Sequence, residues 1–355
     1  MSTANASRSN VARYVASRLG QAVVVLWAAY TVSFIVLYAL PSDPVALKTG
    51  GDASDVTPEQ LAALKATYGL DRPLVVQYAL RLGGVLAGDF GASIDTGRPV
   101  SQVIGEAIPP TLQLAGLGLL VAVLTGASLA VIATFVRSRA LSAFLLGLPP
   151  LGVAIPAFWF GLILIQLFSF QLPLFPAMGD RGFASLVLPS IALALPTGAM
   201  IAQLLSKSLT AALREPYVDT ARAKGAGRAR IHLRHALRNA ALPALTVTGL
   251  VIGQLLSGTV VTETVFSRPG IGRVTATAVQ QQDIPVVQGV VLFAALVFVV
   301  VNLAVDLIYP LLDARIALTS APRLRRRSPS ASRTASPVRT EAPAPVIDAV
   351  LEEAR

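Results

Sequence analysis

Residues 215–243 read EPYVDTARAKGAGRARIHLRHALRNAALP, a basic loop between two apolar segments that are each long enough to cross a bilayer. Counted from Lys207, the loop carries eight Lys and Arg residues against two acidic ones, Glu215 and Asp219. The basic residues are Lys207, Arg214, Arg222, Lys224, Arg228, Arg230, Arg234 and Arg238. Such a charge excess is typical of a loop on the cytoplasmic side of a membrane.

The loop also has a helical pattern, which charge alone does not require. Pro216 after Glu215 is typical of the first turn of a helix, so a short helix is predicted over residues 217–224. Gly225 and Gly227 then interrupt the chain, and a second basic helix is predicted over residues 230–239. A short helix on the cytoplasmic face is a candidate docking element for a soluble partner.

Composition places the whole chain among membrane proteins. Hydrophobic residues make up 54% of the 355 residues and charged residues 14%, with a mean hydropathy of +0.66. Six apolar stretches have about 20 residues or more each, enough to span a hydrocarbon core of about 30 Å. They are residues 20–40, 112–136, 141–168, 186–205, 242–261 and 286–308. We therefore expect an all-α integral membrane protein with six transmembrane helices.

The third stretch contains Pro149, Pro150 and Pro156, which predict either a kink or one tilted helix. The basic residues predict the orientation of all six. With the N-terminus inside, the cytoplasmic segments hold 21 of the 29 Lys and Arg residues, which places both termini in the cytoplasm. The net charge of +10 is then mostly a topology signal, and nucleic-acid binding is not expected.

Residues that could carry metal or covalent chemistry are few. Without cysteine, no disulfide or thiolate metal site is possible. His232 and His235 lie three apart; a metal pair is conceivable, but a solvated cationic face is favoured. The chain has no G-x-x-x-x-G-K-[ST] phosphate loop, no G-x-S-x-G elbow and no H-E-x-x-H motif. We therefore expect no catalytic residues, no metal and no cofactor bound by this chain.

The basic loop resembles a segment of a known family. TARAKG at residues 220–225 and LRHALRN at residues 233–239 resemble the coupling loop of ABC importer permeases. In the general signature, E-A-A-x-x-x-G, Asp219, Thr220 and Ala221 stand in for the first three residues, and Gly225 is the glycine. The loop differs less from the pattern of the dipeptide/oligopeptide/nickel branch than from this general signature. The closer resemblance is to the first (B-type) permease subunit of that branch.

This resemblance implies a fold, partners and a site. The fold would be a type I ABC importer permease in a bacterial inner, or plasma, membrane. The partners would be a paralogous permease subunit, two ATPase subunits that use ATP and Mg²⁺, an extracytoplasmic substrate-binding protein and the lipid bilayer. In the family the loop forms a helix that sits in a groove of the ATPase. The residues to which the resemblance assigns ATPase coupling are Glu215, Tyr217, Asp219, Thr220, Ala221, Arg222, Ala223, Lys224 and Gly225.

The first external loop, residues 41–110, is too long for a simple connector. Short helices are predicted over residues 57–68 and 74–86, with a turn at residues 88–93. The strings YGLDRPLVVQY and GDFGAS resemble the external insertion of the same family. A cap over the helix ends and a direct contact with a binding protein are equally favoured.

A second group of residues is a candidate translocation pathway or gate. The string ETVFSRPGIG, residues 263–272, is family-like; a loop that folds back toward the pathway and an ordinary external turn are equally favoured. Asn302 and Asp306 lie at i and i+4 on one helix face, and a structural role for Asp306 is favoured over substrate contact. The candidates are Phe158, Trp159, Glu263, Phe266, Pro269, Gly270, Asn302 and Asp306.

The predicted organisation has four parts. They are a cytoplasmic N-terminus (1–19), the first transmembrane helix with the external insertion (20–110), a permease core (111–313) that contains the coupling loop (206–241), and a disordered basic tail (314–355). The predicted function is a permease subunit that forms half of the pore of an ATP-driven importer.

The transported solute stays open at this point: the family includes permeases for peptides, nickel chelates, glutathione and antibiotic-like peptides. The alternative functions are a secondary transporter and a non-transport membrane scaffold. Proton or sodium coupling would usually leave several intramembrane carboxylates, and one, Asp306, is present. The importer is therefore favoured.

Overall fold

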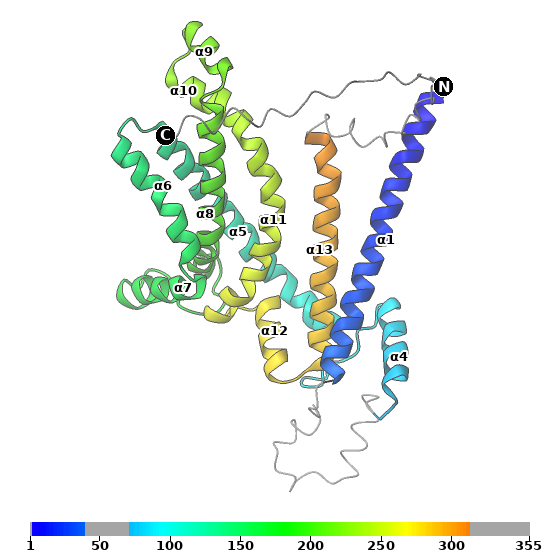
Figure 1. The fold of residues 1–355 in the computed structure, drawn as a ribbon. Helices are drawn as coiled ribbons and strands as arrows, with labels where there is room; N and C mark the ends of the chain where they lie inside the picture. Colours follow the sequence, from blue (N-terminus) through cyan, green and yellow to red (C-terminus); the bar gives the residue numbers. More distant parts are fainter. Residues whose placement is uncertain (1, 40–70, 313–355) are drawn as a thin grey trace, which may run out of the picture. The chain divides into compact units, whose positions relative to one another are not determined.

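The computed structural model describes residues 2–39 and 71–312 (Figure 1). Within these ranges the side chains of residues 2–15, 39, 242–252, 301–302 and 304–312 are not described. The predicted helix at residues 57–68 and the predicted disordered tail lie outside the described residues. All contacts discussed below lie within the compact unit Met1–Tyr309.

The described part of the chain is helical apart from its connecting loops, so the all-α prediction is confirmed. The elements are α1 (Ser2–Ala39), α4 (Leu74–Leu86), α5 (Val100–Phe135), α6 (Arg139–Ala154), α7 (Ala157–Ile165), η1 (Gln166–Gln171), α8 (Ala184–Ala212), α9 (Pro216–Ala223), α10 (Arg228–Arg230), η2 (Ile231–Ala236), α11 (Leu237–Val265), α12 (Ile271–Gln280) and α13 (Ile284–Leu312). Each of the six predicted apolar stretches falls on one of the long helices or on the broken helix α6–α7.

Three of the described helices are long and apolar enough to cross a membrane: residues 16–38 of α1, α5 and α8. The pair α6 and α7 adds a fourth candidate if it is one span, and it bends by 99° at the break between its halves. The break consists of Ile155 and Pro156, which both have an extended backbone, so the predicted kink is confirmed. The count of six spans and the location of the termini stay predictions.

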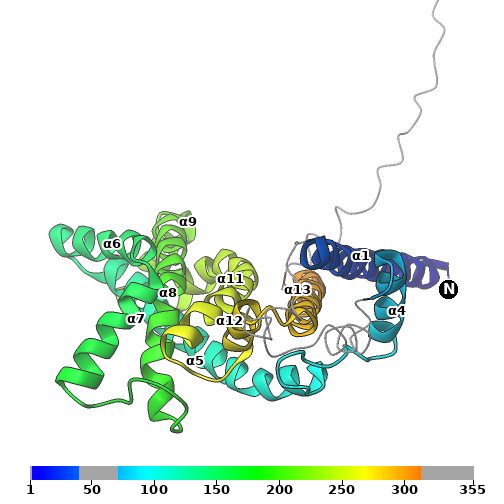
Figure 2. The same cartoon turned by 90° about the horizontal axis from the view of Figure 1, so that it is seen from below.

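Small residues let α5 and α8 lie side by side (Figures 1 and 2). They recur every four residues on both helices, as Gly118, Ala122, Gly126 and Ala130 on α5 and as Ala194, Gly198 and Ala202 on α8. A Cβ at Gly126 would collide with the carbonyl oxygen of Gly198. Close packing through small side chains is a general means of helix association in membranes, where the apolar effect does not drive helices together.

The connection from α11 to α13 contains a helix that the sequence analysis does not predict, α12. Its sequence, IGRVTATAVQ, is rich in β-branched residues, which have a low helix propensity. Contacts from other elements stabilise its first turn, as described below. The segment after Val265, the last residue of α11, is therefore a tight turn followed by a helix.

Candidate functional site

The short helix predicted in the basic loop is present as α9, displaced by one residue at each end from the predicted bounds. Glu215 has the extended backbone of an N-cap residue, and Pro216 stands at the first helical position, as predicted. Val218 is only 1% exposed, and α9 packs against η2. One side of α9 is therefore anchored on the following segment of the loop.

Most of the coupling candidates are exposed. Tyr217 and Ala221 are half-buried, and the exposed residues are Glu215, Asp219, Thr220, Arg222, Ala223, Lys224 and Gly225. The Arg222 guanidinium and the Asp219 carboxylate form an exposed ion pair of 3.2 Å, which contributes little to stability. Both groups are consequently free to exchange this contact for one with a partner.

Gly225 ends α9 in a left-handed conformation, with φ +81°. Its N–H donates to the carbonyl of Arg222 at 2.9 Å, and the N–H of Ala226 donates to the carbonyl of Ala221 at 3.0 Å. These two bonds form a Schellman motif, in which the αL residue is usually glycine. A Cβ on Gly225 would meet nothing within 4 Å, so the glycine is required by backbone conformation rather than by crowding in this chain.

The second basic helix differs from the prediction. Residues 230–239 do not form a separate helix, because α10, η2 and α11 follow one another without a gap and run into the membrane stretch. The middle segment, η2, is a π-helix, a rare form that often marks functional positions. A displacement at the start of this helix is therefore passed directly to α11.

His232 lies inside the protein, and the expectation of a solvated cationic face is wrong for this residue. Its side chain is 3% exposed, its Nε2 lies 3.1 Å from the Thr134 hydroxyl, and its ring meets the edge of Phe135 with 5.3 Å between centroids. Burial, with a smaller contribution from Arg228, lowers the pKa of the His232 imidazole below its usual value of 6.5. The local sequence does not distinguish His232 from His235, because the burial comes from α5.

Arg228 completes this contact. Its guanidinium lies over the Phe135 ring, 5.0 Å from the centroid, which is a cation–π distance. Phe135 is thus held between Arg228 and His232, both from the loop. The C-terminal end of α5 is therefore attached to the loop by a cation–π contact, an edge-to-face ring contact and a hydrogen bond.

A cluster of small and aliphatic side chains joins three helices below α9. Its buried members are Ala130 of α5, Leu205, Leu209 and Ala212 of α8, Ala236 of η2 and Ala240 of α11. The loop is covalently continuous with α8 and α11, and these contacts pack it against α5 as well. This arrangement can transmit a force applied at α9 to the membrane helices.

Near the other end of α11 from the basic loop, Glu263 is completely buried, and its carboxylate is hydrogen-bonded. Its carboxylate accepts hydrogen bonds from the Thr111 hydroxyl at 2.7 Å and from the N–H groups of Gly272 and Arg273 at 2.8 and 3.3 Å. The N–H groups belong to the first turn of α12, where a carboxylate is stabilising. A Cβ on Gly270 would collide with this carboxylate. Glu263 thus ties α5, α11 and α12 together.

The other pathway candidates lie in different surroundings. Phe266 is buried against α7, where Gly161 leaves room for its ring, whereas Phe158 and Trp159 are half exposed on α7. Pro269 and Gly270 line a cavity of about 370 Å³ between α5, α12 and the loop at residues 93–98. Asn302 and Asp306 are both in α13, but their side chains lie outside the described residues. The eight candidates therefore do not form one cluster among the described residues.

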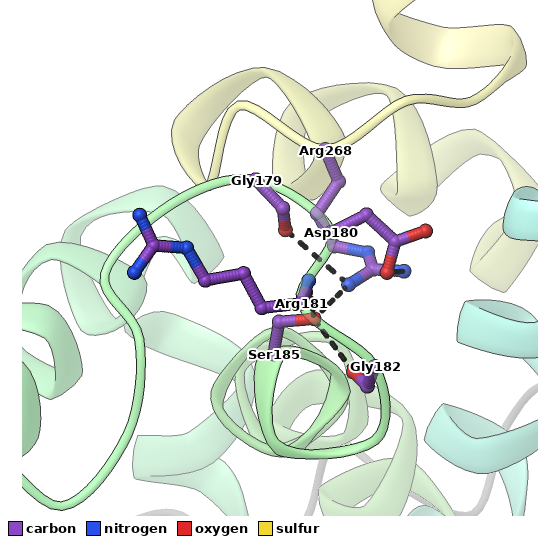
Figure 3. Close-up of polar contacts among 6 residues, drawn as sticks. All are labelled: Gly179, Asp180, Arg181, Gly182, Ser185 and Arg268. Atoms are coloured by element: carbon purple, nitrogen blue, oxygen red, sulfur yellow. Dashed lines mark hydrogen bonds and ion pairs between the residues drawn. The ribbon is translucent and has the colours of Figure 1, made fainter.

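Arg268 is a buried residue that the sequence analysis treats only as a positive charge. It is 1% exposed, and its guanidinium donates to the Ser185 hydroxyl at 2.8 Å and contacts the Asp180 carboxylate at 3.3 Å (Figure 3). The N–H of Gly179 donates to the carbonyl of Phe266 at 3.0 Å. These contacts fasten the turn after α11 to the loop before α8.

Asp283 has a similar structural role at the start of α13. Its carboxylate accepts hydrogen bonds from the Ser93 hydroxyl and from the Ile94 and Asp95 N–H groups. The GDFGAS turn is therefore held against the end of a membrane helix, as the cap alternative requires. Contact with a binding protein at this loop is not tested by these bonds.

Comparison with known proteins identifies the family. Residues 118–318 match the family described as "Binding-protein-dependent transport system inner membrane component", and residues 11–115 match the N-terminal component of the same transport systems. The chain belongs to this permease family. The permease is accordingly an inner-membrane transport component of an ABC importer, and the ATPase is a separate subunit.

Curated relatives have nearly the same length. The "Probable peptide ABC transporter permease protein y4tP" of Sinorhizobium fredii is 36% identical over 311 residues, which cover 85% of this chain and 98% of the relative. The "Glutathione transport system permease protein GsiC" of Salmonella paratyphi A is 36% identical over 303 residues, with the same coverage. A solved structure of the MetNI methionine ABC transporter is 15% identical, with a TM-score of 0.47, and covers 60% of this chain and 97% of that one; it is too distant to add to the argument.

Proposed function

We propose that the permease forms one half of the membrane pathway of an ATP-driven importer for peptides or related small solutes. A paralogous permease supplies the other half, two ATPase subunits bind ATP and Mg²⁺ and dock on α9, and an extracytoplasmic binding protein delivers the solute. The relatives named for peptide and glutathione transport support this solute class. The permease itself holds no nucleotide in this scheme.

The observation that carries the proposal is the geometry of α9. The helix presents an exposed polar side, is closed by a Schellman motif at Gly225, and rests on η2 through its other side. The loop is in turn attached to α5 by His232 and Arg228 and is continuous with α8 and α11. Closure of the ATPases would move α9 and, through these contacts, shift the populations of inward- and outward-open states.

The proposal is tested on the complete transporter, co-expressed with its neighbouring subunits and placed in nanodiscs. Ala221→Glu inserts a charge on the small-residue part of α9, and Gly225→Asp strains its last turn. Both variants are expected to insert normally, because the residues lie outside the apolar stretches, but to release the ATPase or to abolish solute-stimulated hydrolysis. Co-elution of the subunits and the ATPase rate measure these effects.

Arg230→Ala is the matched control, because Arg230 is exposed in the same loop. Arg228 is unsuitable, since it stacks on Phe135. Full subunit association and full stimulation in both α9 variants would refute the coupling role. Uptake of labelled dipeptides and of glutathione, compared in cells that lack other carriers for them, tests the solute class separately.

A further inference from the structure

A groove that contains two cationic side chains lies between α6 and α8, close to the end of α8 that leads into the coupling loop. Its volume is about 480 Å³, and its lining residues are Leu146, Gln203, Ser206, Lys207, Thr210, Ala211 and Arg214. Neither the coupling contacts nor the pathway candidates involve this groove. The cations and hydroxyls in it therefore have no assigned role.

The two cations of the groove lie near the end of α8. Gln203, Lys207 and Thr210 are spaced by four and three residues, which places them on one face of the helix. Arg214 lies two residues beyond Ala212, the last residue of α8, and its N–H donates to the carbonyl of Ala211 at 3.0 Å, so it lines the same groove from the turn that follows the helix. The long, flexible side chains of Lys207 and Arg214 can converge on one anion.

Both cations lack a counter-charge in the described part of the chain. No side-chain hydrogen bond or ion pair joins Lys207 or Arg214 to another described residue, and no Asp or Glu lines the groove. The Thr210 hydroxyl donates to the carbonyl of Ser206, and the Ser206 hydroxyl donates to the carbonyl of Gln203. Both hydroxyls are thus hydrogen-bonded to backbone carbonyls of α8. The free charge of the groove is consequently positive.

The end of the predicted apolar stretch of α8, residues 186–205, places the groove at the expected depth of lipid headgroups. The apolar stretch of α8 ends at Leu205, so Lys207 and Arg214 follow directly after the hydrocarbon segment. Leu146 of α6 provides a partly exposed apolar wall beside the cations, and α6 exposes further large apolar side chains, including Phe144 and Leu151. Basic pockets between membrane helices at this depth are suited to anionic headgroups.

We propose that the groove between α6 and α8 is a binding site for an anionic phospholipid, with Lys207 and Arg214 holding the phosphate and Leu146 contacting an acyl chain. This site is separate from α9 and from solute transport. A phospholipid bound here would fill the space between α6 and the end of α8, the helix that enters the coupling loop.

The test uses the complete transporter, purified in detergent, freed of lipid and titrated with phosphatidylglycerol or with phosphatidylcholine. Native mass spectrometry counts the bound lipids. The wild type is expected to prefer phosphatidylglycerol. Because one cation near an anionic headgroup contributes a factor on the order of fivefold, the Lys207→Gln/Arg214→Gln variant is expected to lose roughly 30-fold in phosphatidylglycerol affinity. Its phosphatidylcholine binding should be unchanged.

Arg230→Gln/Arg234→Gln is the control, since it removes the same charge from exposed residues outside the groove. Equal phosphatidylglycerol binding by the wild type and the groove variant would overturn the proposal, as would an equal loss in the control. The proposal would also fail if inorganic phosphate alone displaced phosphatidylglycerol from the wild type at matched concentration, because the site would then take a free anion. If a partner subunit covers the groove, the groove variant and the control variant would bind phosphatidylglycerol equally, and this result would also overturn the proposal.

Discussion

The Nε2 atom of His232 lies 3.1 Å from the hydroxyl of Thr134, although 98 residues separate them in the chain. This bond joins the coupling loop to the last turn of α5, and the rings of Phe135 and His232 meet in a T-shaped contact with 5.3 Å between centroids. A loop held only at its two covalent ends could move without α5. The contact attaches α5 to the loop that joins α8 to α11.

The first expectation concerns pH. The pKa of His232 is lower in the folded protein than in the unfolded chain. As the pH falls below about 6.5, the unfolded chain therefore binds more protons at this residue than the folded protein does. The stabilisation from a neutral His232 is therefore complete above the ordinary pKa and is lost as the pH falls through the lower, folded-state value. The thermal midpoint of the purified permease should decline in this range, and His232→Gln should reduce that decline. His235→Gln should leave the wild-type pH dependence unchanged; an unchanged profile in His232→Gln would contradict the assignment.

A second expectation follows from the φ of +81° at Gly225. Alanine in a left-handed position costs about 1 kcal/mol, a β-branched residue costs more, and asparagine is tolerated better. Solute-stimulated ATPase activity should decrease in the order Gly, Asn, Ala, Val at this position. Gly227→Ala is the control, because Gly227 has φ −66° and open space at its Cβ, and it should have no effect. If Gly225→Val had the same solute-stimulated ATPase activity as Gly225→Asn, backbone conformation would not be the reason for the glycine.

The third expectation concerns the buried carboxylate of Glu263. Glu263→Ala removes the acceptor for the Thr111 hydroxyl and for two N–H groups of α12, and is expected to destabilise the permease by about 3 kcal/mol. Thr111→Val should cost about 1–2 kcal/mol. Denaturation in detergent, followed by tryptophan fluorescence, measures both. The double variant should be less destabilised than the sum, since the residues share one bond. Strict additivity would argue against a direct interaction.

The fourth expectation concerns topology, which rests on the charge count alone. The chain contains no cysteine, so single cysteines at Thr3, Ser54 and Ser332 can be labelled without background. In intact cells an impermeant maleimide should react only with Ser54→Cys. Labelling of Ser332→Cys under the same conditions would overturn the arrangement with six spans and cytoplasmic termini.

Much of this protein follows from local sequence. Stretches of about 20 apolar residues predict the membrane helices because helix length and bilayer thickness must match. Pro216 marks the start of α9 and Gly225 its end because both act through their own backbone dihedrals. The family resemblance is likewise a property of contiguous strings, and the matching family confirms it.

Tertiary structure decided the contacts between distant segments. Glu263 is a cap for α12 only because Thr111, 152 residues away, and the first turn of α12 meet it. His232 is buried because α5 ends beside it, and Asp283 holds a turn that lies 190 residues earlier. Local patterns cannot reveal such partners, since the energy of a buried polar group depends on what packs around it rather than on its neighbours in sequence.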